Sequence, residues 1–264
     1  MFCQVNDNRL FVADEGEKSP VLLFIHFWGG SSGTWKPVTD ILHTKYRCVR
    51  FDQRGWGKSD KPESGYDINS LADDVMALVE ALRLDDYILV GHSMGGKIAQ
   101  TVAGRKPKGL RKLILIAPSP AAPTIMPPEM KQAMIAAYTS LENITGTIEQ
   151  VFKASDLSIE CKQQVIKDMQ QHSAEARRGW PELALEEDVS GCLPNIQIPT
   201  FVIAGENDIV DAPDRLKQEV VQKIPNAEMA VIPNVGHLIM LQAPQKVAEL
   251  INVFVNNQPK DEWA

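Results

Sequence analysis

The chain has 264 residues, 44% of them hydrophobic, and carries a formal net charge of −7. This length allows a large core, in one domain or in a domain with an insertion, and the acidic balance argues against a surface for nucleic acid or for an anionic membrane. No apolar run approaches the roughly 20 residues of a membrane-spanning helix.

Short apolar runs alternate with helical patterns through the first half of the chain. Strands are expected at residues 21–26, 46–51, 87–90 and 113–117. Apolar residues recur at helical spacing over residues 70–83, and a second helix is expected at 97–105. This alternation predicts parallel strands joined by right-handed crossovers.

The alternation stops at a proline-rich stretch, after which residues 129–191 show helical patterns and no convincing strand. Strands return at 200–204 and 228–232, and a final amphipathic helix is expected at 244–255. We therefore predict an α/β fold with a mostly parallel sheet flanked by helices and a helical cap insertion. The core domain would comprise residues 1–120 and 193–264, and the cap residues 121–192. Such an insertion is expected to lie over the loops where ligands bind.

The run Gly91-His92-Ser93-Met94-Gly95-Gly96 follows a predicted strand and precedes a predicted helix. Strand, G-x-S-x-G and helix together are typical of a nucleophile elbow, in which a sharp turn exposes the serine hydroxyl. An ordinary strand-to-helix turn would give the same short pattern. A nucleophilic Ser93 also needs a base to take its proton and an acid to orient that base.

The base is best sought among the five histidines. His43 and His172 lie in polar stretches and are expected to be solvated, and His26 ends the first buried strand. His92 is adjacent to Ser93 in sequence, so its side chain should point elsewhere. His237 follows the last strand pattern directly, where open α/β sheets place catalytic groups, and we predict that it is the base.

The acid should be a carboxylate on another such loop. Asp208 lies in a short polar segment that directly follows the strand expected at 200–204. Glu206 and Asp211 are close competitors. We expect Glu206 to be solvated, and Asp211, which precedes Ala212-Pro213, fits the N-cap of a helix. Asp208 is therefore the preferred acid.

Acyl transfer also needs donors for a developing oxyanion. One is expected from the backbone N–H of Met94, just after the nucleophile at a helix N-terminus. The other should come from the loop after an early strand, residues 26–30, where the Trp28 N–H is the candidate. Gly29 and Gly30 would let this backbone approach a ligand closely.

With these motifs the chain resembles the α/β-hydrolase superfamily, in particular its small serine esterases, lactonases and non-haem haloperoxidase-like members. The matching segments follow the family order and lie at residues 26–30, 52–60, 91–96, 205–208 and 236–237. The order Ser93, Asp208, His237 is also that of the family. The resemblance implies a serine hydrolase that cleaves a carboxylic ester or lactone through an acyl-enzyme, with Arg54 buttressing the site.

The sequence departs from the family pattern at three positions. Phe27 replaces the usual glycine after the histidine of the early loop, and we expect it to shape the pocket or shift the oxyanion donor. Relatives that cleave carbon–halogen bonds or epoxides carry aspartate at the nucleophile position, so Ser93 argues against both activities. Gln242 replaces a common glutamate and is expected to affect local packing only.

Two other functions fit parts of the same pattern. The triad could serve carbon–carbon bond hydrolysis of a diketone-like substrate, or perhydrolysis through an acyl-enzyme. Some relatives are small-molecule receptors that retain a triad, but their elbows usually lack the Met94-Gly95-Gly96 found here.

The side chains expected to contact the substrate come from the early loop, the elbow and the cap: Phe27, Trp28, His92 and Trp180, with Met134 as a further possibility. No metal or organic cofactor is implied, because no cluster has ligand spacing and no G-x-G-x-x-G opens a helix. The predicted partner is a small-molecule ester or lactone, without nucleic acid or membrane, and the oligomeric state is not indicated. Four scattered cysteines and the lack of a visible signal peptide predict free thiols in the cytoplasm.

Overall fold

An eight-stranded sheet forms the centre of the protein in the computed structural model, which describes residues 1–256. The strand order is β1-β2-β4-β3-β5-β6-β7-β8; β1 and β2 pair antiparallel with their neighbours, and the other strands pair parallel. The strand bounds are β1 Phe2–Val5, β2 Asn8–Glu15, β3 Val21–Ile25, β4 Arg47–Phe51, β5 Tyr87–His92, β6 Leu110–Ile116, β7 Thr200–Gly205 and β8 Ala227–Ile232. The prediction of a mostly parallel α/β sheet is confirmed.

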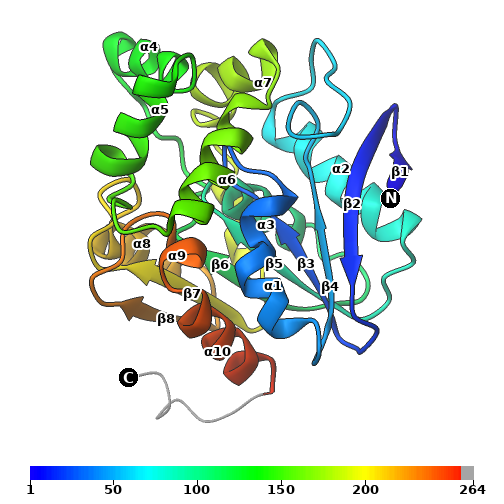
Figure 1. Ribbon diagram of the computed structural model, residues 1–264. Helices are drawn as coiled ribbons and strands as arrows, with labels where there is room; N and C mark the ends of the chain where they lie inside the picture. The colour runs from blue at the N-terminus through cyan, green and yellow to red at the C-terminus, as the bar shows by residue number, and fades with distance from the viewer. Residues whose placement is uncertain (257–264) are drawn as a thin grey trace.

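Helices cover both faces of this sheet (Figure 1). On one face α1 (Lys36–Leu42) packs against α10 (Pro244–Val255), and on the other α2 (Ile68–Ala81) packs against α3 (Met94–Gly104). The short helices η1, α8, η5 and α9 span Ser32–Trp35, Pro213–Glu219, Val221–Lys223 and Ile239–Gln242. No helix within residues 1–256 is long and apolar enough to cross a membrane.

The central strands are apolar throughout because helices bury both of their faces. Every residue of β3 and of β5 is buried, which explains their continuous apolar runs. The edge hairpin of β1 and β2 was not predicted from the sequence. In β2, buried residues alternate with exposed or half-buried ones, as expected for a strand with one face open to solvent, whereas three of the four residues of β1 are exposed or half-buried.

The chain between β6 and β7 contains helices and no strand. These elements are α4 (Pro128–Ala136), α5 (Leu141–Gly146), η2 (Thr147–Val151), α6 (Ile159–Gln170), α7 (Ala174–Gly179), η3 (Trp180–Ala184) and η4 (Ser190–Asn195). Helices α4 to α7 form the upper part of the molecule in Figure 1. We call residues 121–192 the cap.

The two ends of the cap lie side by side. The N–H of Val189 donates to the carbonyl of Ala121 (2.9 Å), and the N–H of Thr124 donates to the carbonyl of Leu185 (3.0 Å). The buried Lys97 of α3 ties this junction to the core, because its Nζ donates to the carbonyls of Leu185 (3.1 Å) and Glu187 (2.7 Å). These bonds support the proposed cap limits, which stay a prediction; residues 257–264 of the predicted core lie outside the described residues.

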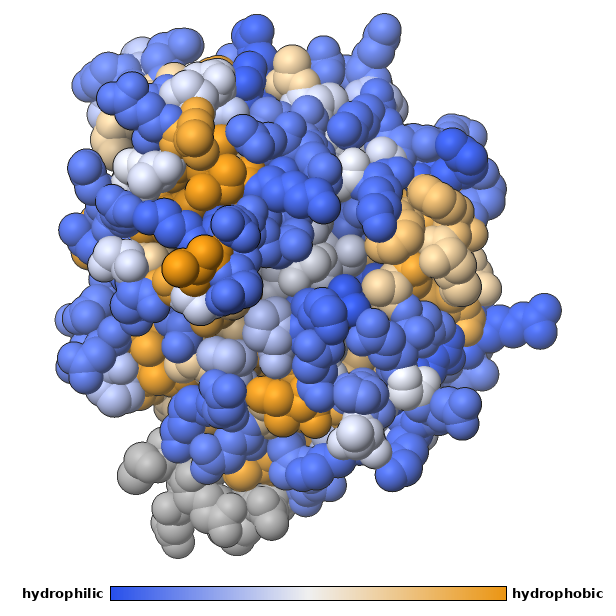
Figure 2. Space-filling view, viewed as in Figure 1, coloured by the Kyte–Doolittle hydropathy of each residue, from blue (hydrophilic) through white to orange (hydrophobic). Residues whose placement is uncertain are grey.

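The surface is hydrophilic over most of the face seen in Figure 2, with separate apolar patches between charged side chains. Several exposed large apolar side chains belong to the cap: Ile125, Met130, Leu141, Val151, Ile159 and Leu183. The cap thus carries much of the apolar surface that the described part of the chain exposes.

A buried carboxyl joins the cap to the core. Asp168 of α6 accepts hydrogen bonds from Gln164 Nε2 (2.7 Å) and from the Thr34 hydroxyl (3.4 Å), and only 2% of the residue is exposed. Burial raises the pKa of Asp168 to about 7, and the nearby charge of Asp52 acts in the same direction, whereas the hydrogen bonds oppose it. The folded protein therefore holds a proton on Asp168 at pH values where an unfolded chain has lost it.

Replacing Asp168 with asparagine should change how stability depends on pH. Between the pKa of an unfolded aspartate, roughly 4, and the folded value of about 7, the folded state binds more protons, so wild-type stability falls as pH rises through this window. Asparagine cannot ionise. We expect the free energy of unfolding of Asp168→Asn, relative to that of wild type, to rise by about 3 kcal/mol between pH 5 and pH 8.5.

Urea denaturation at the two pH values measures this difference. The matched control is Asp40→Asn, because Asp40 is exposed and pairs with Lys36 on the surface of α1. The stability of Asp40→Asn relative to wild type should not rise between pH 5 and pH 8.5. A pH-independent difference between Asp168→Asn and wild type would contradict the prediction.

Candidate active site

Ser93 lies in a sharp turn between β5 and α3. Its backbone has φ 52° and ψ −117°, a conformation that side-chain-bearing residues adopt rarely and that costs on the order of 1–3 kcal/mol. Gly95 explains part of the local sequence: a Cβ there would lie 2.5 Å from the carbonyl oxygen of Ile25. The Ser93 N–H donates to the Ile116 carbonyl of β6 (3.2 Å), which anchors the turn to the sheet.

A chain of hydrogen bonds links Ser93 to the predicted base and acid. The Ser93 hydroxyl lies 3.0 Å from Nε2 of His237, and Nδ1 of His237 lies 2.8 Å from Oδ2 of Asp208. Asp208 follows β7 and His237 follows β8, so neighbouring parallel strands bring them to the same edge of the sheet as Ser93. All three residues are buried, and Ser93 keeps 8% of its surface exposed.

Asp208, the predicted acid, is held in its charged form by several donors. Its Oδ1 accepts hydrogen bonds from the backbone N–H groups of Val210 (2.8 Å) and Asp211 (3.1 Å). Burial alone would raise the pKa of Asp208, but the charge and hydrogen bond of His237, with these N–H donors, lower it below its usual value. A charged Asp208 fixes the His237 tautomer with hydrogen on Nδ1, which leaves Nε2 free to accept the serine proton.

The pKa of His237, the predicted base, is shifted in the opposite direction. Burial lowers the pKa of His237, but the charge of Asp208, its hydrogen bond and the charge of Asp211 together raise it above its usual value. This combination stabilises an imidazolium, the form that a general base adopts after taking a proton.

Asp211 corrects one expectation from the sequence. Helix α8 begins at Pro213 after Ala212, and no side chain caps it, so Asp211 is not the N-cap residue. Its side chain is instead buried beside the triad, 3.6 Å from Arg215, and burial raises its pKa to about 7. Glu206 is exposed, as expected, and accepts a hydrogen bond from the N–H of Asn234.

Two aromatic side chains and a second histidine surround the base. The rings of His92 and Phe152 lie 4.9 Å and 5.2 Å from that of His237, and Phe27 packs edge-on against both of these neighbours. The His237 N–H donates to the Phe152 carbonyl (2.8 Å), so the cap also holds the backbone of the base. Sequence reasoning missed Phe152, because nothing in a helical insertion indicates which aromatic residue faces the core.

His92 has a supporting contact that the sequence did not reveal. Its Nε2 donates to the backbone carbonyl of His237 (2.9 Å), and burial lowers its pKa well below the usual value, so the ring is neutral. His92 is completely buried, and its predicted role in substrate binding stays a prediction.

The early loop lies close to the triad through Phe27 and contacts the cap through Trp28. Within residues 1–256, neither the backbone N–H of Trp28 nor that of Met94 has a hydrogen-bond acceptor. Met94 is the first residue of α3, where a helix leaves its N–H groups without internal partners. Both amides therefore lack a protein acceptor within the described residues, and their role as oxyanion donors stays a prediction.

A second loop supports the early loop from the core. The Gln53 N–H donates to Nε2 of His26 (3.0 Å), and Gln53 Nε2 donates to the His26 carbonyl (2.8 Å). In the same loop Arg54 forms a two-pronged ion pair with Asp74 of α2, with both N–O distances 2.6 Å. This buried pair supports the loop and does not reach the triad directly.

The remaining predicted residues lie in the cap. Trp180 begins η3 and is 5% exposed, and Met134 is a partly buried residue of α4. His172 was expected to be solvated, but it is partly buried, and its ring lies 6.0 Å from that of Tyr138. The expectation was wrong because the polar segment around His172 folds against the core, where His172 and Trp56 form an isolated antiparallel β-bridge.

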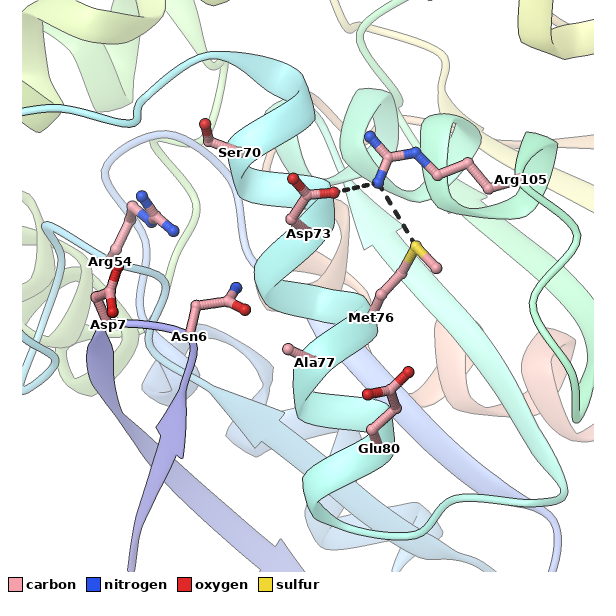
Figure 3. Close-up of a pocket in the computed structure, with 9 residues that line it drawn as sticks. All are labelled: Asn6, Asp7, Arg54, Ser70, Asp73, Met76, Ala77, Glu80 and Arg105. Atoms are coloured by element: carbon pink, nitrogen blue, oxygen red, sulfur yellow. Dashed lines mark hydrogen bonds and ion pairs between the residues drawn. The ribbon is translucent and has the colours of Figure 1, made fainter.

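A surface depression lies apart from these residues (Figure 3). It measures about 590 Å³ and runs along α2, where Asp73 and Met76 both contact Arg105. None of the triad residues lines it, so it does not serve the Ser93 centre. Within residues 1–256, no group of three or more histidine, cysteine or carboxylate side chains could hold a metal ion.

Known proteins resemble this chain over almost its whole length. A family model described as the alpha/beta hydrolase fold matches residues 20–244. The AB hydrolase superfamily protein YisY of Bacillus subtilis is 30% identical, covering 94% of this chain and 96% of the relative. A pimeloyl-[acyl-carrier protein] methyl ester esterase of Nitrosospira multiformis is 26% identical over 90% of this chain and 94% of the relative. The esterase EaEST from Exiguobacterium antarcticum, a solved structure, superposes with a TM-score of 0.88 at 24% identity, covering 97% and 98% of the two chains.

Proposed function

Because this chain belongs to the α/β-hydrolase family, we propose that it is a serine hydrolase that cleaves a carboxylic ester or lactone through an acyl-enzyme. The names of its relatives confirm that it is an enzyme. The observation that carries the narrower proposal is the hydrogen-bonded series Ser93, His237 and Asp208, with distances of 3.0 Å and 2.8 Å.

Acylation begins when the Ser93 oxygen attacks the carbonyl carbon of the substrate. His237 Nε2 takes the hydroxyl proton as the new C–O bond forms, and Asp208 stabilises the resulting imidazolium. The carbonyl π electrons move onto the oxygen, where the N–H groups of Trp28 and Met94 would stabilise the negative charge. Collapse of this intermediate expels the alcohol oxygen, which takes the proton from His237 and leaves an ester on Ser93.

Deacylation repeats these steps with water as the nucleophile. His237 takes a proton from water as its oxygen bonds to the acyl carbon, and it returns that proton to the departing Ser93 oxygen. The product is a carboxylic acid and the enzyme is regenerated. With a lactone, alcohol and acid remain parts of one molecule, so ring opening requires the same proton transfers.

The cap and the early loop are proposed to bind the substrate. Phe27 packs against His92, and the Trp28 indole reaches the cap at Arg177. Cap residues such as Trp180 would contact the more distant part of the substrate. Ser93 is only slightly exposed, so the substrate must displace side chains around it to reach the hydroxyl.

The proposal is tested by stopped-flow hydrolysis of p-nitrophenyl esters with acyl chains of increasing length, alongside a panel of lactones. A burst of p-nitrophenol equal to the enzyme concentration, followed by slower turnover, is expected for an acyl-enzyme. A vinylogous diketone tests for carbon–carbon bond hydrolysis by the same triad, and added hydrogen peroxide tests for perhydrolysis. Turnover of the diketone alone, with no ester or lactone hydrolysed, would contradict the proposal.

A further inference from the structure

The cap holds the early loop at Trp28 by three contacts. The Tyr138 hydroxyl donates to the Trp28 carbonyl (2.9 Å), and the Tyr138 ring lies 4.3 Å from the Trp28 ring. The Trp28 indole N–H donates to the Arg177 carbonyl of α7 (3.2 Å). Both partners lie more than 100 residues further along the chain, so these contacts form only when the cap is docked on the core.

The space beside this contact leaves no room for another side chain. Gly29 follows Trp28 with φ +95°, and a Cβ at that position would lie 2.6 Å from the Tyr138 ring. Tyr138 is itself 3% exposed and has the ring of His172 beside it, with ring centres 6.0 Å apart. The tyrosine is thus fixed by its neighbours and presents its hydroxyl to the Trp28 carbonyl.

These contacts with the cap restrict the direction of the Trp28 backbone N–H, which the proposed mechanism needs as an oxyanion donor. The hydrogen bond from Tyr138 fixes the peptide plane that follows Trp28, and the ring contact and the indole hydrogen bond fix the Trp28 side chain. Together they restrict rotation about the bonds of the Trp28 α-carbon, and so they limit the direction of the preceding N–H. Oxyanion donors are effective only when their direction is set before the charge develops.

We propose that Tyr138 is a positioning residue, which orients the Trp28 N–H for the oxyanion, so that the docked cap completes the oxyanion hole. This inference rests on the proposed function. It assigns to the cap a part in the chemical step, beyond the binding of substrate. Tyr138 acts through the backbone of Trp28 and does not touch the reacting atoms.

The variant Tyr138→Phe removes the hydroxyl and keeps the ring. We expect kcat for p-nitrophenyl esters to fall about tenfold, with KM changed less than twofold, because the donor matters more in the transition state than in the bound substrate. The inhibition constant of an alkylboronic acid, which mimics the tetrahedral intermediate, should rise by a similar factor. The pH at which kcat/KM reaches half its plateau should stay unchanged, because His237 keeps its partners.

The matched control is Tyr66→Phe. Tyr66 is also buried, and its hydroxyl donates to the Pro62 carbonyl (2.7 Å) and lies 3.3 Å from the Ser173 hydroxyl of the cap, but it does not contact the early loop. The Tyr66→Phe variant should lose stability as Tyr138→Phe does, which thermal unfolding measures. Its kcat should stay within twofold of wild type.

Three results would overturn the proposal: an unchanged kcat in Tyr138→Phe, equal losses of kcat in both variants, or an effect confined to KM. Failure of the proposed function itself would look different. In that case the wild-type protein would hydrolyse no ester or lactone, or the Ser93→Ala variant would hydrolyse them as fast as wild type.

Discussion

Replacing Ser93 with alanine is expected to lower kcat for any ester or lactone substrate by about 10⁶-fold, to the level left by binding and the oxyanion donors. The alanine has no oxygen to attack the carbonyl, and His237 then has no proton to take at the 3.0 Å contact. The burst of product should disappear together with steady turnover. Initial rates with a p-nitrophenyl ester, measured at enzyme concentrations high enough to detect the residual rate, give the ratio.

Ser119→Ala provides the control for this variant. Ser119 is buried next to the elbow, and its backbone N–H donates to the Ser93 carbonyl (3.0 Å), a contact that the substitution leaves in place. Its kcat should stay within a few-fold of wild type. A Ser93→Ala protein with more than about one hundredth of the wild-type kcat would exclude Ser93 as the nucleophile, since loss of a triad nucleophile costs far more.

Replacing Asp208 with asparagine is expected to lower kcat by about 10⁴-fold. Asparagine can keep the geometry, but its amide favours the wrong tautomer of His237 and leaves the imidazolium without a negative partner. The pH profile should move as well. Activity needs neutral His237 and so rises with pH through its pKa; because Asp208 holds that pKa up, its loss should move the rise to lower pH.

The two neighbouring carboxylates test the assignment of the acid. Asp211→Asn should move the rise in kcat/KM to lower pH, because the charge of Asp211 also raises the pKa of His237, but the hydrogen bond from His237 to Asp208 remains and the loss of kcat should be much smaller. Glu206→Gln should change neither quantity, since Glu206 is exposed and bonded to Asn234. A greater loss in Asp211→Asn than in Asp208→Asn would make Asp211 the acid.

The parallel part of the fold was predictable because its signals are local. The buried strands have continuous apolar runs, and the final helix was expected at residues 244–255 and is observed at Pro244–Val255. The β1–β2 hairpin escaped prediction because its only apolar run of more than two residues, Leu10 to Ala13 of β2, is short and lies between the charged residues Arg9 and Asp14. Helix α3 was expected to begin at Lys97 but begins at Met94, because the elbow passes directly into the helix.

The candidate triad could be proposed from sequence because each member follows a strand, and parallel strands end at a shared edge. The contacts that surround it could not. Tyr138 and Phe152 reach Trp28 and His237 only through the docking of the cap, which depends on packing between residues far apart in the chain. Asp211 fitted a helix cap by its spacing to Pro213, but the direction of its side chain depends on the tertiary fold.

The side-by-side ends of the cap make it an exchangeable module. Because Ala121 is hydrogen-bonded to Val189, the intervening segment leaves and rejoins the core at nearly one point, and its length can vary without altering the register of β6 and β7. A different segment inserted at this point would leave the sheet unchanged, and if the cap binds the substrate as proposed, it would also change the substrate range. The tyrosine contact to Trp28 limits this freedom: a transplanted cap would have to bring its own support for the early loop, or the core would lose rate along with its old specificity.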